Sequence, residues 1–511
     1  MSLKRLFLAA ATALLIAAPA GQGMAQSKPA ALKLGVDVDA GTLDPRTARD
    51  TTAYRAVNLI YDGLVQLSPD LKPVPNLAVS WENPDPLTYI FKLRDGVKFQ
   101  DGTPLTAEDV VFTFSTILDP KLASVSRALY TPIAKIESLD AKTVKFTLSA
   151  PYSPLLSYLD MGIVSKKATE AGDIGQKPVG TGPMKLGNWA KGSKITLVAN
   201  DEFWGGKIPV TQLDLVVIGD NTARAQALEA GDLDFIQSPL SPQDIKRLAG
   251  NAKFGNAVTS WLGVTDLNFN TPDPRIAGPA MRRALAMLVD QTTIVDKIYE
   301  GVDKVATSVL MPTSWAYTDK VKQPGFNVEG AKKALADLGW KDTNGDGILD
   351  KGGQKLTITL STHSEDPSRV QSVEYMQTVF KQAGIDVQLR ITDWPSFSTN
   401  YVQKSMHQVA LLGWLNIVDP DRLTFGQLST GGSTNWGKYS NPKLDEPLQK
   451  GRTALKIEDR KAAYEAAAAV VAQDLPYYIV SYQGYQMFYN KALGDLPVDA
   501  RGNFRNLFVG K

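Results

Sequence analysis

The stretch from Ser80 to Asp119 constrains the fold of this 511-residue chain more than any other. Residues 89–94 alternate in side-chain character, which predicts a strand with one buried face. Asp95-Gly96 and Asp101-Gly102 predict two turns, with a short return strand at 97–99 between them. The stretch therefore begins as a hairpin-like unit.

A helix follows this hairpin in the predicted fold. Thr106 and Asp109 have the three-residue spacing of a capping box, in which each side chain satisfies a backbone N–H of the other residue. The apolar residues that follow recur with helical spacing, and Asp119-Pro120 ends the helix. This unit is structural and carries no chemistry of its own.

A second region predicts the fold class. Residues 355–360 alternate cleanly between apolar and polar side chains, which predicts a strand. Residues 372–382 have helical character, and residues 387–391 are a second predicted strand. A β-α-β order implies that the two strands are parallel. We therefore expect an α/β protein.

The N-terminus predicts a secretory signal, residues 1–25. Two basic side chains precede an apolar run from Leu6 to Ala18. Small residues at Gly23 and Ala25 favour cleavage after Ala25, and Ala18-Pro19-Ala20 is a second possible site. The apolar run is shorter than the ~20 residues that a membrane span needs. We expect an exported, cleaved protein.

Charge and cysteine content limit the partners and the compartment. The chain has 55 basic and 53 acidic residues, and only two of these charges precede Gln26, so the mature chain is formally neutral. This balance gives no indication of nucleic acid or an anionic membrane as a partner. With no cysteine, the chain has neither disulfides nor a lipid-modified N-terminal cysteine. An exported protein without a lipid anchor would diffuse away from a cell that lacks an outer membrane, so we expect a Gram-negative periplasm.

Several runs of the sequence carry a family resemblance. They are Ser80–Glu82, Phe91–Phe99, Asp101-Gly102, Thr106–Val110, Val179–Met184 and Phe203–Lys207. Together they resemble the signature of the dipeptide/oligopeptide/nickel class of extracellular solute-binding proteins (family 5), the large periplasmic receptors of ABC importers.

The resemblance implies a two-lobed periplasmic binding protein of type II, in the large class, with an extra subdomain in the first lobe. Lobe I would comprise residues 26–264 with an inserted subdomain at about 65–180. Lobe II would comprise residues 265–480, and residues 481–511 would return to lobe I. Two strand-like crossings would then connect the lobes.

The implied function is capture of a short peptide or peptide-like solute between the lobes and delivery to ABC permease subunits in the inner membrane. Alternatives within the family are an oligosaccharide or a metal chelate. Alternatives of another class are a periplasmic chaperone or hydrolase. We expect a monomer that binds no nucleic acid.

Catalytic motifs are absent from the sequence. The two histidines, His363 and His407, lack the spacing of a metal-binding pair, and neither HExxH nor Gly-x-Ser-x-Gly occurs. Ser440 and Lys443 match Ser-x-x-Lys in spelling alone, because Pro442 is unsuited to the helix that this motif requires. We expect no enzyme activity and no cofactor.

The run from Leu411 to Arg422 is the main candidate for ligand contact. An apolar strand enters a polar loop stopped by proline, and Gly413-Trp414 followed by Asp-Pro matches the ligand-facing loop of the family. Peptide-binding relatives carry an amine-binding aspartate there, at a place that falls on Asn416 or Ile417 here. Asp419 could replace it, or could instead cap a helix that starts with Pro420.

Further candidates flank this loop. Arg369 stands where some dipeptide-binding relatives hold a carboxylate, although it could equally be a solvated arginine at a helix start. Trp394, Trp414 and Trp436 could wall an apolar pocket or belong to the core. We expect a solute with an acidic group and no requirement for a free α-amine.

Two loops allow alternative interpretations. Residues 39–45 form a loop that the resemblance places at the ligand cleft, although a turn closed by Asp44-Pro45 needs no ligand. Residues 342–350 resemble the start of an EF-hand loop, but Gly353 occupies the position of the bidentate glutamate. A polar hairpin turn is the alternative to calcium binding there.

The signal segment generates a direct test. N-terminal sequencing of the mature protein should start near Gln26, in the periplasmic fraction and without an attached lipid. Retention of Met1 in a membrane fraction would contradict this expectation.

Overall fold

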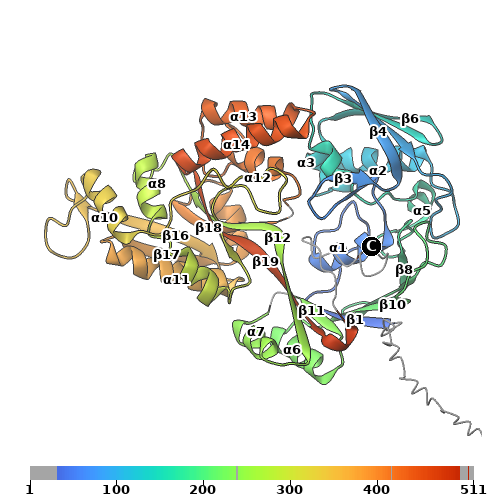
Figure 1. Cartoon of the computed structure of the whole chain (residues 1–511), viewed down its shortest axis with the longest axis horizontal. Coiled ribbons are helices and arrows are strands. Elements are labelled where there is room, and N and C mark those ends of the chain that lie inside the picture. The colour runs from blue at the N-terminus through green and yellow to red at the C-terminus, as the bar shows by residue number, and fades with distance from the viewer. Residues whose placement is uncertain (1–30, 238–239, 416, 495–504, 506–511) are drawn as a thin grey trace, which may run out of the picture.

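Two long strands connect the halves of the molecule in the computed structural model, which describes residues 31–237, 240–415, 417–494 and 505 (Figure 1). They are β12 (Phe254–Phe269) and β19 (Tyr477–Asn490), which pair antiparallel. Both belong to an 11-stranded sheet of order β17-β16-β18-β12-β19-β11-β1-β10-β9-β8, with β13 beside β19. One half of the sheet therefore lies in each lobe. The predicted signal segment, residues 1–25, lies outside the described residues.

The first strand of lobe I, β1, lies between β10 and β11 and pairs in parallel with both. The side chains of Leu32, Leu34 and Val36 are buried in one core with the apolar face of α1. The elements of this lobe are β1 (Ala31–Val36), α1 (Thr51–Ile60), α5 (Lys166–Ala171), β8 (Met184–Ala190), β9 (Lys194–Ala199), β10 (Gln212–Val217), α6 (Asn221–Ala230), β11 (Phe235–Gln237) and α7 (Pro242–Ala249).

A separate four-stranded antiparallel sheet, ordered β4-β5-β7-β6, forms a subdomain with its own core. Phe91, Phe114 and Phe146 meet edge to face there, with Phe146 5.5 Å from each of the other two ring centroids. The elements are β2 (Val65–Leu67), β3 (Pro73–Pro75), β4 (Ala78–Asp85), β5 (Thr88–Leu93), α2 (Ala107–Leu118), η1 (Pro120–Leu122), α3 (Arg127–Tyr130), β6 (Ile133–Asp140), β7 (Thr143–Leu148) and α4 (Leu155–Tyr158).

The predicted helix start is confirmed, and the predicted return strand is wrong. The Asp109 carboxylate accepts from the backbone N–H of Thr106 at 3.0 Å, as a capping box requires. Residues 97–99 make only one isolated bridge, between Lys98 and Pro104. The turn follows so closely that the N–H of Phe99 donates to the carbonyl of Thr103, which leaves no room for a strand.

Lobe II contains the predicted β-α-β unit, and its strands β16 and β17 pair in parallel. Leu356, Ile358 and Leu360 are buried in the lobe core, as their alternation predicted. The elements on this side are α8 (Pro279–Ala286), α9 (Gln291–Thr293), η2 (Ile294–Ile298), β13 (Lys304–Val305), α10 (Val328–Asp337), β16 (Thr357–His363), α11 (Pro367–Gln382), β17 (Asp386–Thr392), η3 (Pro395–Val402) and β18 (Val409–Trp414).

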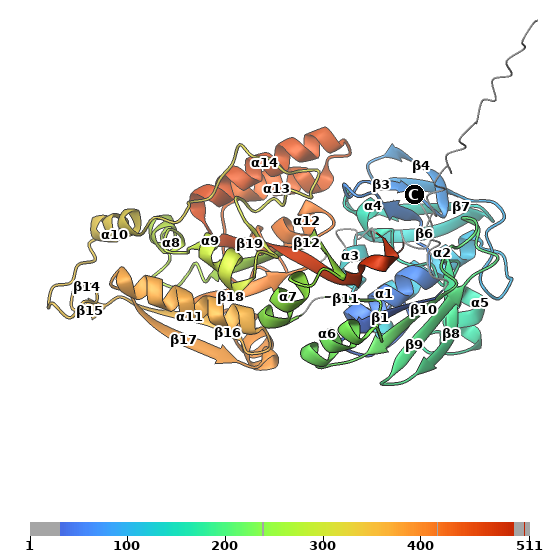
Figure 2. The same cartoon turned by 60° about the horizontal axis from the view of Figure 1, so that its bottom comes forward.

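Three further helices of lobe II reach the subdomain of lobe I. They are α12 (Pro420–Leu428), α13 (Pro442–Thr453) and α14 (Ile457–Asp474), and Figure 2 shows α13 and α14 beside the subdomain. The Ser153 N–H donates to the Arg452 carbonyl at 2.9 Å, and its hydroxyl donates to the Ala454 carbonyl at 2.6 Å. The lobes thus touch away from β12 and β19. Within the described ranges, no helix has the length and apolar character to cross a bilayer.

The paired strands change register between the lobes. The register of β12 against β19 shifts between Ser260 and Val264. Residues 264–269 pair with β18 in lobe II, while residues 487–489 of β19 pair with β11 in lobe I. The irregular point lies at the end of the predicted first lobe, where we expect the lobes to pivot.

Residues 342–350 form a polar turn before the hairpin of β14 (Asp350–Lys351) and β15 (Gln354–Lys355). The Asp342 carboxylate accepts from the backbone N–H groups of Gly345 and Gly347, and Asp346 pairs with Lys355 at 2.6 Å. In the part of the chain that the structure covers, no three histidine or acidic side chains gather as a metal site. The contacts support the hairpin interpretation.

The segment at residues 179–184 passes very close to the end of α1. A Cβ atom at Gly180 would overlap the carbonyl oxygen of Ile60. The backbone of Gly180 also exchanges hydrogen bonds with Gln100 of the subdomain, at 2.9 and 3.2 Å. A residue with no side chain is therefore required where the subdomain rejoins lobe I.

Gly180→Ala should destabilise the protein by about 1–3 kcal/mol, because the backbone must move to admit the methyl group. The control is Gly172→Ala, where the new Cβ meets nothing within 4 Å. Its effect should stay within about 0.5 kcal/mol. Urea unfolding midpoints measure both, and equal midpoints for the two variants would refute the close approach.

Candidate functional site

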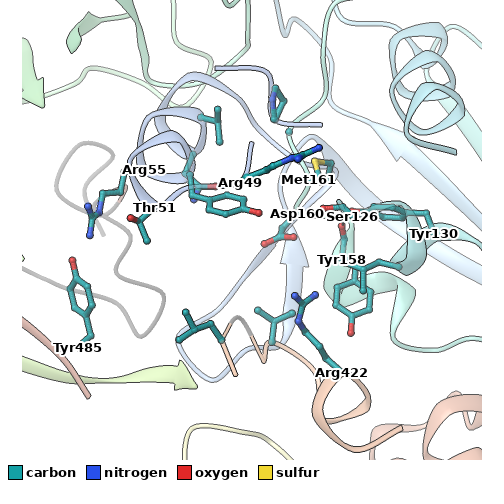
Figure 3. Close-up of a pocket in the computed structure, with 18 residues that line it drawn as sticks. Arg49, Thr51, Arg55, Ser126, Tyr130, Tyr158, Asp160, Met161, Arg422 and Tyr485 are labelled. Atoms are coloured by element: carbon teal, nitrogen blue, oxygen red, sulfur yellow. Dashed lines mark hydrogen bonds between the residues drawn. The ribbon is translucent and has the colours of Figure 1, made fainter. Parts of the chain in front are cut away.

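A cavity of about 290 Å³ lies between the lobes. Lobe I contributes α1, the loop before it, and the subdomain segments around α3 and α4. Lobe II contributes Leu415, Val418 and Arg422, and the connecting strand β19 contributes Tyr485 (Figure 3). From the loop at residues 39–45, which the resemblance places at the cleft, Pro45 lines this cavity. Both lobes and a connecting strand therefore meet at one site.

Four tyrosines, Tyr54, Tyr130, Tyr158 and Tyr485, give the cavity its aromatic character. Burial raises the pKa of Tyr54, Tyr130 and Tyr158, so these hydroxyls stay protonated at neutral pH. The Tyr130 hydroxyl donates to the backbone carbonyl of Tyr158 at 2.6 Å. Such walls suit a ligand with both apolar surface and hydrogen-bonding groups.

Positive charge predominates among the lining residues. Arg49 and Arg55 come from lobe I and Arg422 from lobe II, whereas Asp160 is the one carboxylate that lines the cavity in the described chain. Figure 3 shows Arg422 and Asp160 on one side of the cavity and Arg55 beside Tyr485 on the other. Arg49 donates to the backbone carbonyl of Ala123 at 3.1 Å.

A second cavity, of about 280 Å³, lies beside the connecting strands and shares Leu415 with the first. This second cavity is lined by residues from α7, from the segment after η2 and from the start of α11. Asp303 accepts hydrogen bonds there from the Ser481 hydroxyl at 2.6 Å and the Gly484 N–H at 2.9 Å. Burial raises the pKa of Asp303 to about 6.

The predicted carboxylate-binding arginine lies in this second cavity. The Arg369 guanidinium donates to His363 at 3.0 Å and contacts the Asp366 carboxylate at 3.2 Å. Burial raises the pKa of nearby Asp266 to about 8, although Arg369 and Trp414 oppose this shift, so that carboxyl is mostly neutral at pH 7. Binding of an acidic solute group by Arg369 stays a prediction.

None of the three candidate tryptophans is among the described residues that line the two cavities. Trp414 and Trp436 pack against each other with ring centroids 5.0 Å apart, and both join the small core around Phe397. Trp394 is 46% exposed and meets the edge of the His363 ring. Trp414 and Trp436 thus pack in a core, although we expected them to line a pocket. A ligand contact by any of the three tryptophans stays a prediction.

Asp419 caps helix α12, as one of its two predicted interpretations states. Its carboxylate accepts from the Asp421 N–H at the start of α12 and pairs with Arg460 at 2.7 Å. The side chain is fully buried and lines neither cavity. These contacts favour the N-cap interpretation, and a ligand contact by Asp419 stays a prediction. Asn416 lies outside the described residues, and its ligand contact stays a prediction.

Apart from the loop at residues 39–45, the lobe I wall was missed by reasoning from the sequence. Arg55 lies on the buried face of α1, together with Thr52 and Leu59, three residues before it and four after it. A charged side chain on the apolar face of a short helix is the signal that could have identified it. Tyr130 and Tyr158 had no such signal, because the subdomain fold brings them to the cavity.

Arg460→Gln should destabilise the fold by about 3–5 kcal/mol, because it leaves the buried Asp419 carboxylate without a counter-charge. Lys333→Gln is the control, since it breaks an exposed pair with Asp337 and should leave the unfolding midpoint unchanged. Chemical denaturation measures both. An Arg460→Gln variant as stable as the control would contradict a structural role for this ion pair.

Comparison with known proteins gives one consistent family. The model of the bacterial extracellular solute-binding proteins, family 5 Middle, matches residues 72–436. Oligopeptide-binding protein AppA of Bacillus subtilis is 30% identical over 451 residues, which cover 84% of this chain and 82% of AppA.

Solved structures share the fold. NikZ from Campylobacter jejuni in complex with Ni(L-His) has a TM-score of 0.78 and 26% identity, covering 94% of this chain and 98% of NikZ. Bacillus subtilis AppA in complex with a nonapeptide has a TM-score of 0.77 and 26% identity, with the same coverage. With these matches and a cavity between two lobes, the chain belongs to the bacterial extracellular solute-binding proteins of family 5.

Proposed function

We propose that this protein captures a short peptide or peptide-like solute in the 290 Å³ cavity between its lobes. One observation carries the proposal: residues from both lobes and from β19 line the same cavity. A solute bound there contacts both lobes at once, so it favours the conformation in which they approach each other.

The chemistry of the walls supports a peptide-like solute. Tyrosine hydroxyls can donate to and accept from amide groups, while the rings cover apolar side chains. The similarity to AppA, a protein named for oligopeptide binding and solved with a nonapeptide, supports the same class. The similarity to NikZ in complex with Ni(L-His) keeps a metal chelate as the second candidate.

We further propose that the mature protein is a periplasmic, unlipidated monomer that delivers its solute to ABC permease subunits in the inner membrane and catalyses no reaction. The predicted signal segment and the absence of cysteine support this location. The proposed units are lobe I at residues 26–264 and 481–511, with the subdomain at about 65–180, and lobe II at residues 265–480.

Mass spectrometry of the solute that co-purifies with the protein tests the proposed class. A peptide or amino-acid conjugate, bound once per chain, is the expected result. A metal chelate would favour the second candidate, and turnover of added peptides by the purified protein would contradict a purely binding role.

Solute should also make the protein more compact. The register change between Ser260 and Val264 gives the two connecting strands a place to bend, and the contact of Ser153 with Arg452 and Ala454 would join the lobes in the closed form. Small-angle scattering should therefore show a smaller radius of gyration when protein stripped by unfolding and refolding is saturated with its co-purified solute. An unchanged radius at saturation would count against closure.

A further inference from the structure

Among the described residues, the guanidinium groups of two arginines in the cavity between the lobes have no hydrogen-bond or ion-pair partner. The first, Arg55, is only 8% exposed and lines the cavity from α1. In the part of the chain that the structure describes, no hydrogen bond or ion pair engages its guanidinium, and the nearby charge of Arg224 is of the same sign. A buried, unpaired cation is unfavourable, so an anionic group that enters the cavity and pairs with Arg55 is stabilised.

Arg422 repeats the pattern on the opposite lobe. It is exposed to the cavity, and no partner of its guanidinium occurs among the described residues. It lies in the first turn of α12, where the helix dipole disfavours positive charge. Across the cavity, its positive charge opposes the rise that burial causes in the pKa of Tyr54, Tyr130 and Tyr158. Local structure therefore gives no stabilising reason for an arginine at this place.

Four aspartates near the cavity do not neutralise these arginines, because each already pairs with another arginine. Each of four carboxylates near the cavity walls has its own guanidinium: Asp44 with Arg46, Asp62 with Arg505, Asp419 with Arg460 and Asp421 with Arg452. Asp160 is the single carboxylate of the described lining, against Arg49, Arg55 and Arg422. The cavity therefore carries an excess of positive charge inside walls of low polarisability, which strengthens its attraction for anions.

We propose that the solute of this cavity is an anion, whose carboxylate or phosphate groups bind Arg55 from lobe I and Arg422 from lobe II. This assignment rests on the proposed function only in taking the cavity as the solute site. Guanidinium groups bind both kinds of anion in bidentate geometry. An anion held from both lobes also links charge recognition to closure, because the second arginine contributes only when the lobes are together.

The test uses the mature chain, stripped of solute by unfolding and refolding, and isothermal titration calorimetry. The probes are three tripeptides with amidated C-termini that differ in one side chain, Ala-Glu-Ala, Ala-phosphoserine-Ala and Ala-Gln-Ala, together with citrate and inorganic phosphate. The variants are Arg55→Gln and Arg422→Gln. Arg390→Gln is the matched control, because Arg390 is an exposed lobe II arginine that lines neither cavity.

An acidic probe should bind the wild type at least about tenfold more tightly than Ala-Gln-Ala, and each cavity variant should remove that preference, because a charged hydrogen bond is lost. Arg390→Gln should bind as the wild type does. Comparison of the glutamate with the phosphoserine peptide, and of citrate with phosphate, distinguishes carboxylate from phosphate. Arg422→Gln should leave the unfolding midpoint of the free protein unchanged or raised, which separates a binding role from a structural one.

The remaining outcomes are decisive. If Ala-Gln-Ala binds as tightly as the acidic peptides, or if both cavity variants bind like the wild type, the anion assignment is wrong while the peptide function stands. If only citrate or phosphate binds, and does so through these arginines, the peptide class is wrong while the anion assignment stands. If no probe binds in an arginine-dependent way, the anion assignment is overturned.

Discussion

The pairing of β12 with β19 is the interaction on which the rest of the structure depends. These are the two long strands that continue from one lobe into the other, and their backbone hydrogen bonds join two half-sheets into one. A pair of strands resists stretching but bends and twists at a register change. The walls of the cavity can therefore move relative to each other without breaking the core of either lobe.

Two glycines allow β12 and β19 to pass close to neighbouring backbone where they connect the lobes. Gly263 faces the Trp414 carbonyl, and Gly484 lies so close to the Val302 carbonyl that a side chain would collide with it. Both glycines lie at the register change between the lobes. The second cavity, with Asp303 and Arg369, is formed at the same place. Whatever occupies that space will affect how the connecting strands bend.

Local features of the fold could be predicted, and long-range ones could not. The capping box of Thr106 and Asp109 and the parallel β-α-β unit depend on residues close in sequence, and both are as expected. The N-cap alternative for Asp419 could also be stated in advance. Its Arg460 partner is 41 residues away, and nothing in the spacing reveals it. The cavity is harder still to predict, because Arg55 and Arg422 come to line the same cavity only through the arrangement of the lobes.

The order of the strands along the chain also matters for how the protein is made. Lobe I cannot complete its sheet when residue 254 is synthesised, because β19, which pairs with β11 and β12, begins only at Tyr477. The buried pair of Asp62 with Arg505 forms later still. At about 5–20 residues per second, the ribosome needs on the order of ten seconds or more to supply these partners. During that interval lobe I remains incomplete, so its sheet closes only after most of the chain has been made.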